Sequence, residues 1–346
     1  GELPVAAMAE EILTEGEGQI RALMTIAGNP VLSTPNGNQL EKALESLDFM
    51  VAVDFYLNET THYANIILPP TSALEHDHYD LVFNLLAVRN VARYSSALFE
   101  PAPDTRHDWQ ILAELHRRLD DGSFQGRFKR WFSARIGPRR ILDFGLRSGP
   151  WGTGFLPFGK GLRMKTLERA VHGVDLGALE SCLPERLRTA NRRIELAPVP
   201  FVGDAQRLLG ILDGETDRQL LLIGRRHLRS NNSWMHNSKR LVRGKDRCTL
   251  LMHPDDSVRL AVAGEARVVV FSRSGRIEVP LELSDEVMPG VVSLPHGWGH
   301  NRPGTRLSVA EEHHGVSSNV LTDVSVVDNL CGYAVVGGVP GRGEPL

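Results

Sequence analysis

The sequence has little cysteine and no paired cysteines. Only Cys182, Cys248 and Cys331 occur among 346 residues, and none belongs to a C-x-x-C motif. Zinc and iron–sulfur sites built from paired cysteines are therefore not indicated within this chain. An odd number of widely spaced cysteines also argues against a disulfide framework, and it fits a reducing, cytoplasmic location.

Long apolar runs and a strong charge imbalance are also absent. No stretch approaches the roughly 20 apolar residues that cross a bilayer, so no membrane segment is expected, and residues 1–4 lack the basic and apolar regions of a signal peptide. The net charge of −3 argues against a generally basic nucleic-acid-binding protein. We therefore expect no nucleic-acid partner.

The sequence contains no convincing catalytic or metal-ligand set. There is no G-x-S-x-G motif and no Ser-His-Asp arrangement, so no catalytic residue is assigned. Glu75-His76-Asp77-His78 has the His-x-His spacing of some metal sites, but no third ligand is evident. No metal ligand is assigned either.

The chain is long enough for two domains and predicts an α/β fold followed by mostly β structure. Residues 20–27, 49–53 and 66–68 are predicted strands, and residues 38–47 form an amphipathic helix between the first two. Strand, helix and strand in this order predict a parallel sheet, which binds ligands beyond the carboxyl ends of its strands. Gly28, Asn29 and Asp54 stand at those ends, although a plain turn also explains Gly28-Asn29-Pro30.

A cationic, amide-rich segment follows the predicted strand at residues 220–223. It reads G-R-R-H-L-R-S-N-N-S-W-M-H-N over residues 224–237, and we call it the arginine loop. Arginine forks suit phosphates, and Ser and Asn side chains supply donors and acceptors for a polar ligand. The pattern alone fits a phosphate or nucleotide cradle and a solvated surface loop equally well.

The arginine loop resembles the start of the C-terminal cofactor-binding domain of molybdopterin oxidoreductases, the dimethyl-sulfoxide-reductase family that includes formate dehydrogenases and nitrate reductases. Other segments resemble that family in the expected order along the chain. They are A-G-N-P at 27–30, V-D at 53–54, N-E-T at 58–60, A-N-I-I-L-P at 64–69, H-P-D-D at 253–256, P-G-V-V at 289–292, H-G-W-G at 296–299 and N-V-L-T-D at 319–323.

The resemblance implies a particular architecture. Residues 1–121 would be part of a Rossmann-like parallel α/β molybdopterin-binding domain, and residues 201–346 a dinucleotide-binding domain built on a six-stranded double-psi β-barrel. Residues 122–200, which are rich in glycine, proline and arginine, are predicted to form a basic connector with short helices. The strict alternation of residues 276–283 predicts a barrel strand with one buried face.

The resemblance also implies a cofactor. The parent enzyme would hold two molybdopterin guanine dinucleotides with molybdenum or tungsten, while a missing N-terminal half supplies the metal ligand and an iron–sulfur cluster. The expected partners are that half, an electron-transfer subunit and a small-molecule substrate. The residues implied in cofactor binding are Gly28, Asn29, Pro30, Asp54, Glu59, Thr60, Asp108, Gly224, Arg225, Arg226, His227, Arg229, Asn231, Asn232, Ser233, His296, Gly297, Trp298 and Asn319.

The sequence leaves several functional interpretations open. The substrate is formate by the nearest resemblance, or nitrate or another oxyanion. A non-enzymatic pterin- or nucleotide-binding module and a nucleic-acid-binding protein are alternatives from other classes. Asp108 suits a guanine edge but also the start of a helix, and Trp298 suits either a pterin contact or the barrel core.

Overall fold

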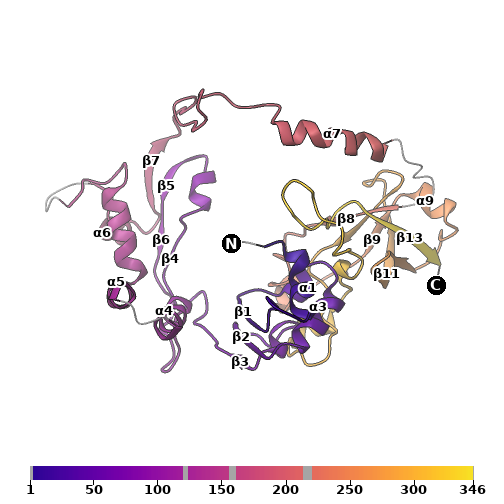
Figure 1. The fold of residues 1–346 in the computed structure, drawn as a ribbon, viewed down its shortest axis with the longest axis horizontal. Coiled ribbons are helices and arrows are strands. Elements are labelled where there is room, and N and C mark those ends of the chain that lie inside the picture. Colours follow the sequence, from indigo (N-terminus) through magenta and orange to yellow (C-terminus); the bar gives the residue numbers. More distant parts are fainter. Residues whose placement is uncertain (1–2, 120–123, 156–160, 213–219, 346) are drawn as a thin grey trace. The chain divides into compact units, whose positions relative to one another are not determined.

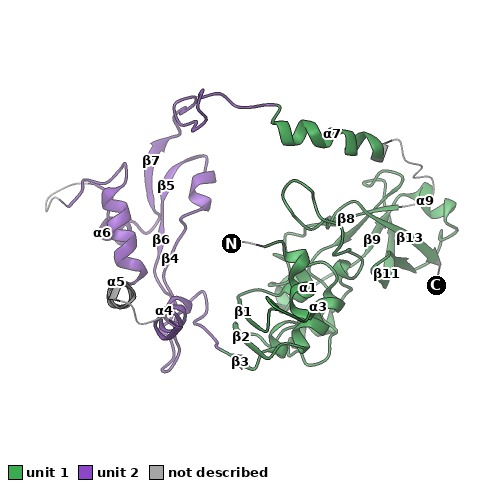
Figure 2. Cartoon of the chain, in the orientation of Figure 1, with its two compact units in different colours: residues 1–67, 197–346 green, residues 68–196 purple. Residues whose placement is uncertain are grey.

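The computed structural model describes residues 3–119, 124–155, 161–212 and 220–345. Its contacts divide the chain into two compact units, coloured separately in Figure 2. Unit 1 combines Gly1–Ile67 with Ala197–Leu346, and unit 2 is Leu68–Leu196. The domain boundaries predicted after residues 121 and 200 stay a prediction.

The N-terminal part of unit 1 is a three-stranded parallel sheet, as the sequence predicted. Its strands are β1 (Ala22–Ile26), β2 (Phe49–Val53) and β3 (Ile66–Ile67), with β2 in the centre. The helices of this part are η1 (Val5–Ala7), α1 (Met8–Leu13), α2 (Pro30–Ser33), α3 (Gly37–Glu45) and η2 (Thr61–Tyr63).

Helix α3 has a clear origin in the sequence. The Asn36 side chain caps it by accepting a hydrogen bond from the backbone N–H of Gln39. Leu40, Ala43 and Leu44 recur at helical spacing and are buried against Met50 of β2. The amphipathic pattern therefore fixes both the helix and the face that it packs on the sheet.

The C-terminal part of unit 1 is a closed six-stranded barrel, which confirms the predicted fold class. The strands run around it in the order β10, β11, β9, β12, β8 and β13, and their pairs are both parallel and antiparallel. Their bounds are β8 (Leu220–Arg225), β9 (Leu250–Met252), β10 (Arg267–Phe271), β11 (Arg276–Leu283), β12 (Val291–Pro295) and β13 (Val339–Pro345). These strands lie together in the orange-to-yellow part of Figure 1.

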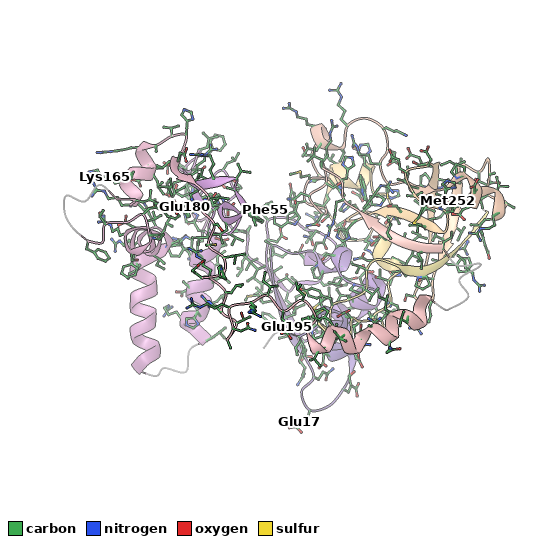
Figure 3. The ribbon with its side chains drawn as sticks, turned by 90° about the horizontal axis from the view of Figure 1, so that it is seen from above. Glu17, Phe55, Lys165, Glu180, Glu195 and Met252 are labelled. Carbon is green, nitrogen blue, oxygen red and sulfur yellow. The ribbon has the colours of Figure 1, made fainter. Side chains whose placement is uncertain are left out.

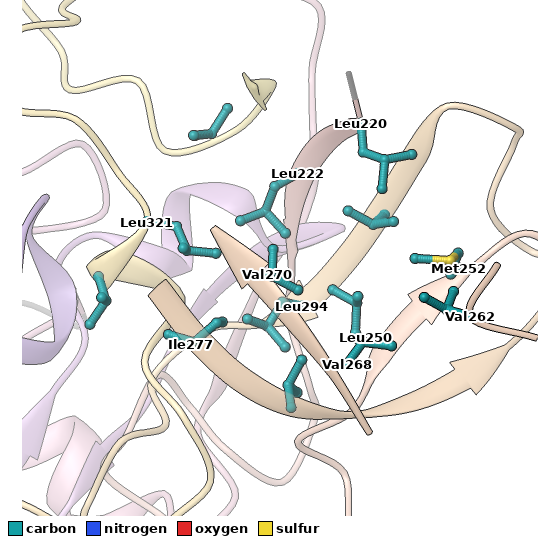
Figure 4. Close-up of a cluster of buried hydrophobic side chains, with 14 residues drawn as sticks. Leu220, Leu222, Leu250, Met252, Val262, Val268, Val270, Ile277, Leu294 and Leu321 are labelled. Atoms are coloured by element: carbon teal, nitrogen blue, oxygen red, sulfur yellow. The ribbon is translucent and has the colours of Figure 1, made fainter. Parts of the chain in front are cut away.

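Apolar side chains from these strands fill the barrel (Figure 4). Leu250, Met252 and Leu294 are fully buried there, and Met252 is labelled among the barrel strands in Figure 3. In β11, Ile277 and Val279 face this core while Arg276 and Glu278 are exposed. The predicted alternation is confirmed over residues 276–279, whereas Leu283 at the end of the strand is 45% exposed.

Helices and turns interrupt this mostly β region. They are α7 (Val199–Leu212), α8 (Lys239–Val242), α9 (Pro254–Arg259), α10 (Ser308–Glu312) and η4 (Ser318–Val320). The predicted strand at residues 220–223 is two residues too short, because β8 continues through Gly224, which pairs with Leu294, to Arg225, which pairs with Pro295. The pairing with β12 therefore extends β8 beyond Gly224.

Unit 2 consists of two small antiparallel strand pairs with helices. β4 (His78–Tyr79) pairs with β6 (Tyr94–Ser95), and β5 (Arg89–Ala92) pairs with β7 (Val174–Ala178). Its helices are η3 (Phe83–Leu86), α4 (Asp108–Leu119), α5 (Phe124–Ser148) and α6 (Met164–Arg169). In α5, Gly137 at a φ of 61° breaks the helix before Pro138, so this part of the predicted connector holds two successive helical pieces.

Among the residues that the structure describes, no helix has the length and apolar character needed to span a membrane.

Candidate functional site

The turn after β1 meets the segment after β2 at one edge of the sheet. Asn29 donates a hydrogen bond from Nδ2 to Oε2 of Glu59 at 2.7 Å and accepts one at Oδ1 from the Thr60 hydroxyl at 2.7 Å. The left-handed residue of this turn is Ala27, with a φ of 48°, and not Gly28. The structure thus joins the predicted site residues Asn29, Glu59 and Thr60.

Asp54 shapes the loop that follows β2. Its carboxylate accepts hydrogen bonds from the backbone N–H of Tyr56 and from Nδ2 of Asn58, at 3.0 and 3.2 Å. Asn58 in turn accepts from the N–H groups of Thr60 and Thr61. These short-range bonds present Glu59 toward Asn29.

In the arginine loop, the three arginines differ in their surroundings. Arg225 donates to the backbone carbonyls of Ser293 and Thr249, at 2.5 and 2.7 Å, and burial lowers its pKa. It therefore anchors the base of the loop to the barrel. Arg226 and Arg229 stand at the surface of the loop, where Arg226 also contacts the side-chain oxygen of Asn232. These two are the forks best placed for an anion.

The H-G-W-G turn packs directly on the arginine loop. Asn231 and Asn232 both adopt left-handed backbone conformations, with φ values of 42° and 61°. Gly297 has a φ of 91°, and a Cβ there would lie 2.3 Å from the carbonyl oxygen of Asn232. Only glycine allows this close approach. Strained non-glycine residues of this kind concentrate at ligand sites.

Trp298 and His296 occupy the same turn. Trp298 is buried at 3% exposure and stacks on His236, with ring centroids 3.9 Å apart. The Trp298 indole is a buried core group, so of the two interpretations of Trp298, a pterin contact or a core side chain, the structure fits the second. Burial, together with the charge of Arg226, lowers the pKa of His296, which favours a neutral ring beside the loop.

A buried chain of hydrogen bonds joins the arginine loop to the sheet edge. His236 Nε2 lies 2.8 Å from the Ser230 hydroxyl, and His236 Nδ1 lies 2.8 Å from His300 Nε2. His300 Nδ1 lies 2.8 Å from Oε1 of Glu59. We call Ser230, His236, His300, Glu59 and Asn29 the buried relay.

The sequence indicates Ser230 only as one of the polar side chains of the arginine loop, and it indicates no role for His236 or His300. All three are at most 3% exposed, and Glu59 is fully buried. Ser230 and His236 lie within the arginine loop, and His300 directly follows the H-G-W-G turn. Their position in these segments was the one feature of the sequence that could have pointed to them. His236 and His300 are 64 residues apart, and His300 and Glu59 are 241 residues apart, so no local sequence pattern predicts these contacts.

The electrostatics of the buried relay favour a charged Glu59 and a neutral His236. Burial alone raises the pKa of Glu59, but the hydrogen bond and charge of His300 and the hydrogen bond from Asn29 outweigh it, so the net shift is downward. Burial, and next the charge of His300, lowers the pKa of His236 to about 3. At neutral pH His236 therefore has one N–H donor and one acceptor nitrogen.

Asn319 ties the barrel to the α/β part. Its Nδ2 donates to the carbonyls of Leu32 and Thr34, at 3.2 and 2.9 Å, and its own carbonyl accepts from the N–H of Asn36. Asn319 is 2% exposed. Its position supports the loops that carry the other candidate residues.

Asp108 belongs to unit 2, where it is exposed at the start of α4 and accepts a hydrogen bond from the backbone N–H of Trp109. It lines a cavity of about 470 Å³ together with His76, His107, Trp109 and Arg139. The ring of His107 stacks on Trp109, and its Nδ1 lies 2.8 Å from the Thr71 hydroxyl. A planar polar ligand suits such a cavity in size and chemistry.

Over the described ranges, no group of three or more His, Cys, Asp or Glu side chains is arranged to hold a metal ion. This includes the His-x-His segment at residues 76–78.

Two family comparisons cover most of the chain. Residues 2–118 match the molybdopterin oxidoreductase family, and residues 220–337 match the molydopterin dinucleotide binding domain. This chain belongs to the molybdopterin oxidoreductases. The two matches include the sheet edge and the barrel that the buried relay connects, and they indicate a molybdopterin cofactor for this molybdopterin oxidoreductase chain.

Similar proteins include formate dehydrogenases and a nitrate reductase. The F420-dependent formate dehydrogenase subunit alpha of Methanocaldococcus jannaschii is 24% identical over 93% of this chain and 42% of its own length. The assimilatory nitrate reductase catalytic subunit of Bacillus subtilis is 36% identical over 31% of this chain and 14% of its own length.

A solved structure shares the fold. Acetylene hydratase from Pelobacter acetylenicus superposes on 99% of this chain with a TM-score of 0.70, at 16% identity, and the match covers 46% of that chain. This chain of the molybdopterin oxidoreductase family therefore spans less than half the length of the three proteins compared.

Proposed function

We propose that this chain is the dinucleotide-binding part of a longer molybdenum- or tungsten-dependent oxidoreductase of the formate-dehydrogenase type. The observation that carries the proposal is the order of the two family matches along the chain. The buried relay supports it, because it holds the candidate loops of both matched regions together within unit 1.

The residues of unit 1 fit a pyrophosphate-containing cofactor. Arg226 and Arg229 offer exposed guanidinium groups, and the backbone of Asn231, Asn232 and Gly297 is held in an unusual, closely packed conformation. His227 and Ser233 add polar groups in the same loop, and His296 adds one in the H-G-W-G turn that packs on it. In this proposal, Arg225, Trp298 and Asn319 lie behind the cofactor site and hold the arginine loop and the H-G-W-G turn in place.

Unit 2 would receive a guanine. The Asp108 carboxylate can accept two N–H groups from a guanine edge, and Trp109 and His107 supply flat rings beside it. The cavity of about 470 Å³ is large enough for a nucleobase. One guanine here and one dinucleotide at the arginine loop would give two dinucleotides per parent enzyme.

The cofactor would supply the two-electron chemistry of the metal, while the protein positions it. A further part of the same enzyme would provide the metal ligand and an iron–sulfur cluster, and a separate subunit would exchange electrons. The three free cysteines support a reducing, cytoplasmic compartment for that enzyme.

The test is cofactor extraction from the intact parent protein, expressed in a host that makes the cofactor. We expect pterin and guanosine monophosphate, with two guanosine monophosphates per molybdenum or tungsten. A preparation with neither pterin nor metal contradicts the proposal. Replacing Asp108 with Asn should lower guanosine monophosphate recovery toward one per metal, whereas the exposed Asp104→Asn control should not.

The alternative substrate is nitrate. It is favoured by the segment that is 36% identical to a nitrate reductase, whereas the formate dehydrogenase relationship covers nearly the whole chain. Formate oxidation and nitrate reduction, each measured with an artificial electron carrier on the loaded parent enzyme, distinguish the two.

A further inference from the structure

The parallel sheet of unit 1 has one covered face. Successive side chains of a strand alternate between the two faces, and directly paired residues of neighbouring strands point to the same face. The register of β1, β2 and β3 therefore assigns each side chain to a face. Leu23 and Met50 point to one face, where they pack with apolar side chains of α1 and α3. Met50 is fully buried there.

The opposite face of the sheet is apolar throughout and largely open to solvent. By register its members are Ala22, Met24, Ile26, Phe49, Val51, Val53 and Ile66, and we call this set the open sheet face. Met24 and Phe49 are each 45% exposed, and Ile26 and Ile66 are each 46% exposed, whereas Val53 at the carboxyl end of β2 is buried. Parallel sheets occur almost only where both faces are covered. Within the described part of the chain, this sheet lacks its second covering layer.

The same sheet has an unpaired edge. The sheet order is β1, β2, β3, so among the described residues the outer edge of β1 has no neighbouring strand. Exposed edges are usually protected by charged side chains, by proline or by a covering segment. Strand β1 reads A-L-M-T-I and contains neither a charge nor a proline. Its outer edge is therefore free to pair with a further strand.

Helix α1 indicates how the sheet continues beyond β1. Connections between parallel strands are right-handed, and α3, which connects β1 to β2, lies on the covered face. A connection that enters β1 from a strand at its outer edge crosses the sheet in the same direction, so it also belongs on the covered face. α1 directly precedes β1 and packs on α3 (Figure 1), with Ala9 and Ile12 in the same cluster as Leu40. α1 thus occupies the position of such a connection.

We propose that the part of the parent enzyme outside this chain docks on the open sheet face and adds a parallel strand to the outer edge of β1. The proposal rests on the proposed function, because it takes the partner to be the remainder of that enzyme. The matched segments cover 42% of the formate dehydrogenase subunit and 46% of acetylene hydratase, so a parent of that length has enough chain for both tasks. The covering layer would be helices that turn an apolar side to the sheet.

A second copy of this chain does not satisfy both features of the sheet. Two copies related by a two-fold axis would pair their β1 edges antiparallel, which leaves each open sheet face without a covering layer. Two copies stacked face to face would cover the apolar side chains, but both β1 edges would stay unpaired. The remainder of the parent enzyme can satisfy the face and the edge together.

The docked part would also complete the site at the Asn29 turn. In open parallel sheets, ligands bind beyond the carboxyl ends of the strands, at the point where the strand order changes direction. β1, β2 and β3 follow one another in a single direction, so strands whose helices lie on the open sheet face run away from β1 in the other direction. The change of direction then falls at β1, whose carboxyl end leads into Gly28 and Asn29.

The experiment is hydroxyl-radical labelling with mass spectrometry, applied to this chain and to the intact parent protein. Oxidation of Met24 should fall about tenfold in the parent, as its exposed fraction drops from 45% to that of a core side chain. Met288, between β11 and β12, is 68% exposed and should be oxidised equally in both. Met50 should stay unreactive in both, which shows that the sheet is folded.

A charged substitution separates docking from folding. Met24→Glu should leave the thermal midpoint of this chain unchanged, because the side chain faces water there. It should lower the midpoint of the parent by roughly 5 °C or more, because the charge is then buried in an apolar contact. Met288→Glu is the matched control and should leave both midpoints unchanged.

Equal oxidation of Met24 in the chain and in the parent, or a parent that tolerates Met24→Glu as well as Met288→Glu, overturns the inference. Protection of Met24 in a dimer of the chain alone also overturns it, because a second copy then covers the face. Should Met50 react in the isolated chain, the comparison of Met24 with Met288 within the parent decides in the same way. A parent that holds pterin and metal but leaves Met24 reactive contradicts the inference alone, whereas one that protects Met24 but lacks the cofactor contradicts the proposed cofactor role alone.

Discussion

At the scale of single residues, Gly297 controls how the H-G-W-G turn meets the arginine loop. A Gly297→Ala variant would place a methyl group 2.3 Å from the Asn232 carbonyl oxygen, at a φ of 91°. We expect a loss of about 3 kcal/mol in the free energy of unfolding, measured by urea denaturation.

Gly224→Ala is the control for that substitution. A Cβ at Gly224 meets nothing within 4 Å, and its φ is not positive. It should change stability by less than about 1 kcal/mol. Equal effects of the two substitutions would show that the close approach of position 297 to the Asn232 carbonyl does not affect stability.

His236 should make stability depend on pH. Its pKa of about 3 in the folded protein lies below the value of about 6.5 in an unfolded chain. Between these values the unfolded state binds more protons, so this contribution is complete above pH 6.5 and is lost as pH falls toward 3. Glu59, whose pKa is lowered too, loses its contribution at the acid end of the same range.

The measurement is the free energy of unfolding at several pH values from 7 to 4. A His236→Gln variant should flatten the decline by at most about 1.4 kcal/mol per pH unit, since a single proton is removed. His313→Gln changes an exposed histidine and should keep the wild-type slope. An unaltered slope in His236→Gln would mean that His236 is not held neutral.

At the scale of helices and strands, the sequence predicted the local patterns and the parallel sheet, but it did not predict how the barrel strands pair. The alternation in β11 and the helical spacing in α3 involve neighbours within a few residues, so the sequence alone indicates both elements. The pairing of β8 with β12 joins Leu221 to Val291, and β13 combines glycine and proline with charged residues. No local sequence pattern predicts the β8–β12 pairing or the strand β13, because both depend on the closure of the barrel.

The same contrast holds in the candidate site. Resemblance pointed to the arginine loop, the H-G-W-G turn and the Asn29 turn as separate segments. Their connection through His236 and His300 depends on burial and on contacts between distant residues, which no spacing rule contains. The difference between an anchored Arg225 and an exposed Arg226 likewise follows from strand register, since Arg225 pairs with Pro295 at the end of the barrel ladder.

Within the barrel, β12 pairs with both β8 and β9, and its Leu294 is fully buried in the core. Leu294→Ala should lower the free energy of unfolding by about 3 kcal/mol, because it removes buried surface and leaves a cavity. Leu221 of β8 is 38% exposed, so Leu221→Ala should cost clearly less. Thermal or urea unfolding of both variants measures the difference.

At the scale of the whole molecule, the α/β part and the barrel of unit 1 are joined by polar contacts between buried or partly buried groups. The buried relay is one connection. A second is Asn319, which donates to two carbonyls near α2, and a third is the ion pair between Arg302 and Glu41. Because buried polar groups are costly to leave unpaired, we expect the sheet and the barrel to unfold as one cooperative unit.

Asn319→Ala tests this cooperativity. The substitution leaves the carbonyls of Leu32 and Thr34 without their donor, and it should cost about 2–3 kcal/mol. Native-state hydrogen exchange should then show that amides in β2 lose protection more than amides in β9, because the sheet opens without the barrel. Asn301→Ala, at an exposed position, should leave both strands protected. Equal loss of protection in β2 and β9 would instead mean that the remaining contacts keep the two parts unfolding together.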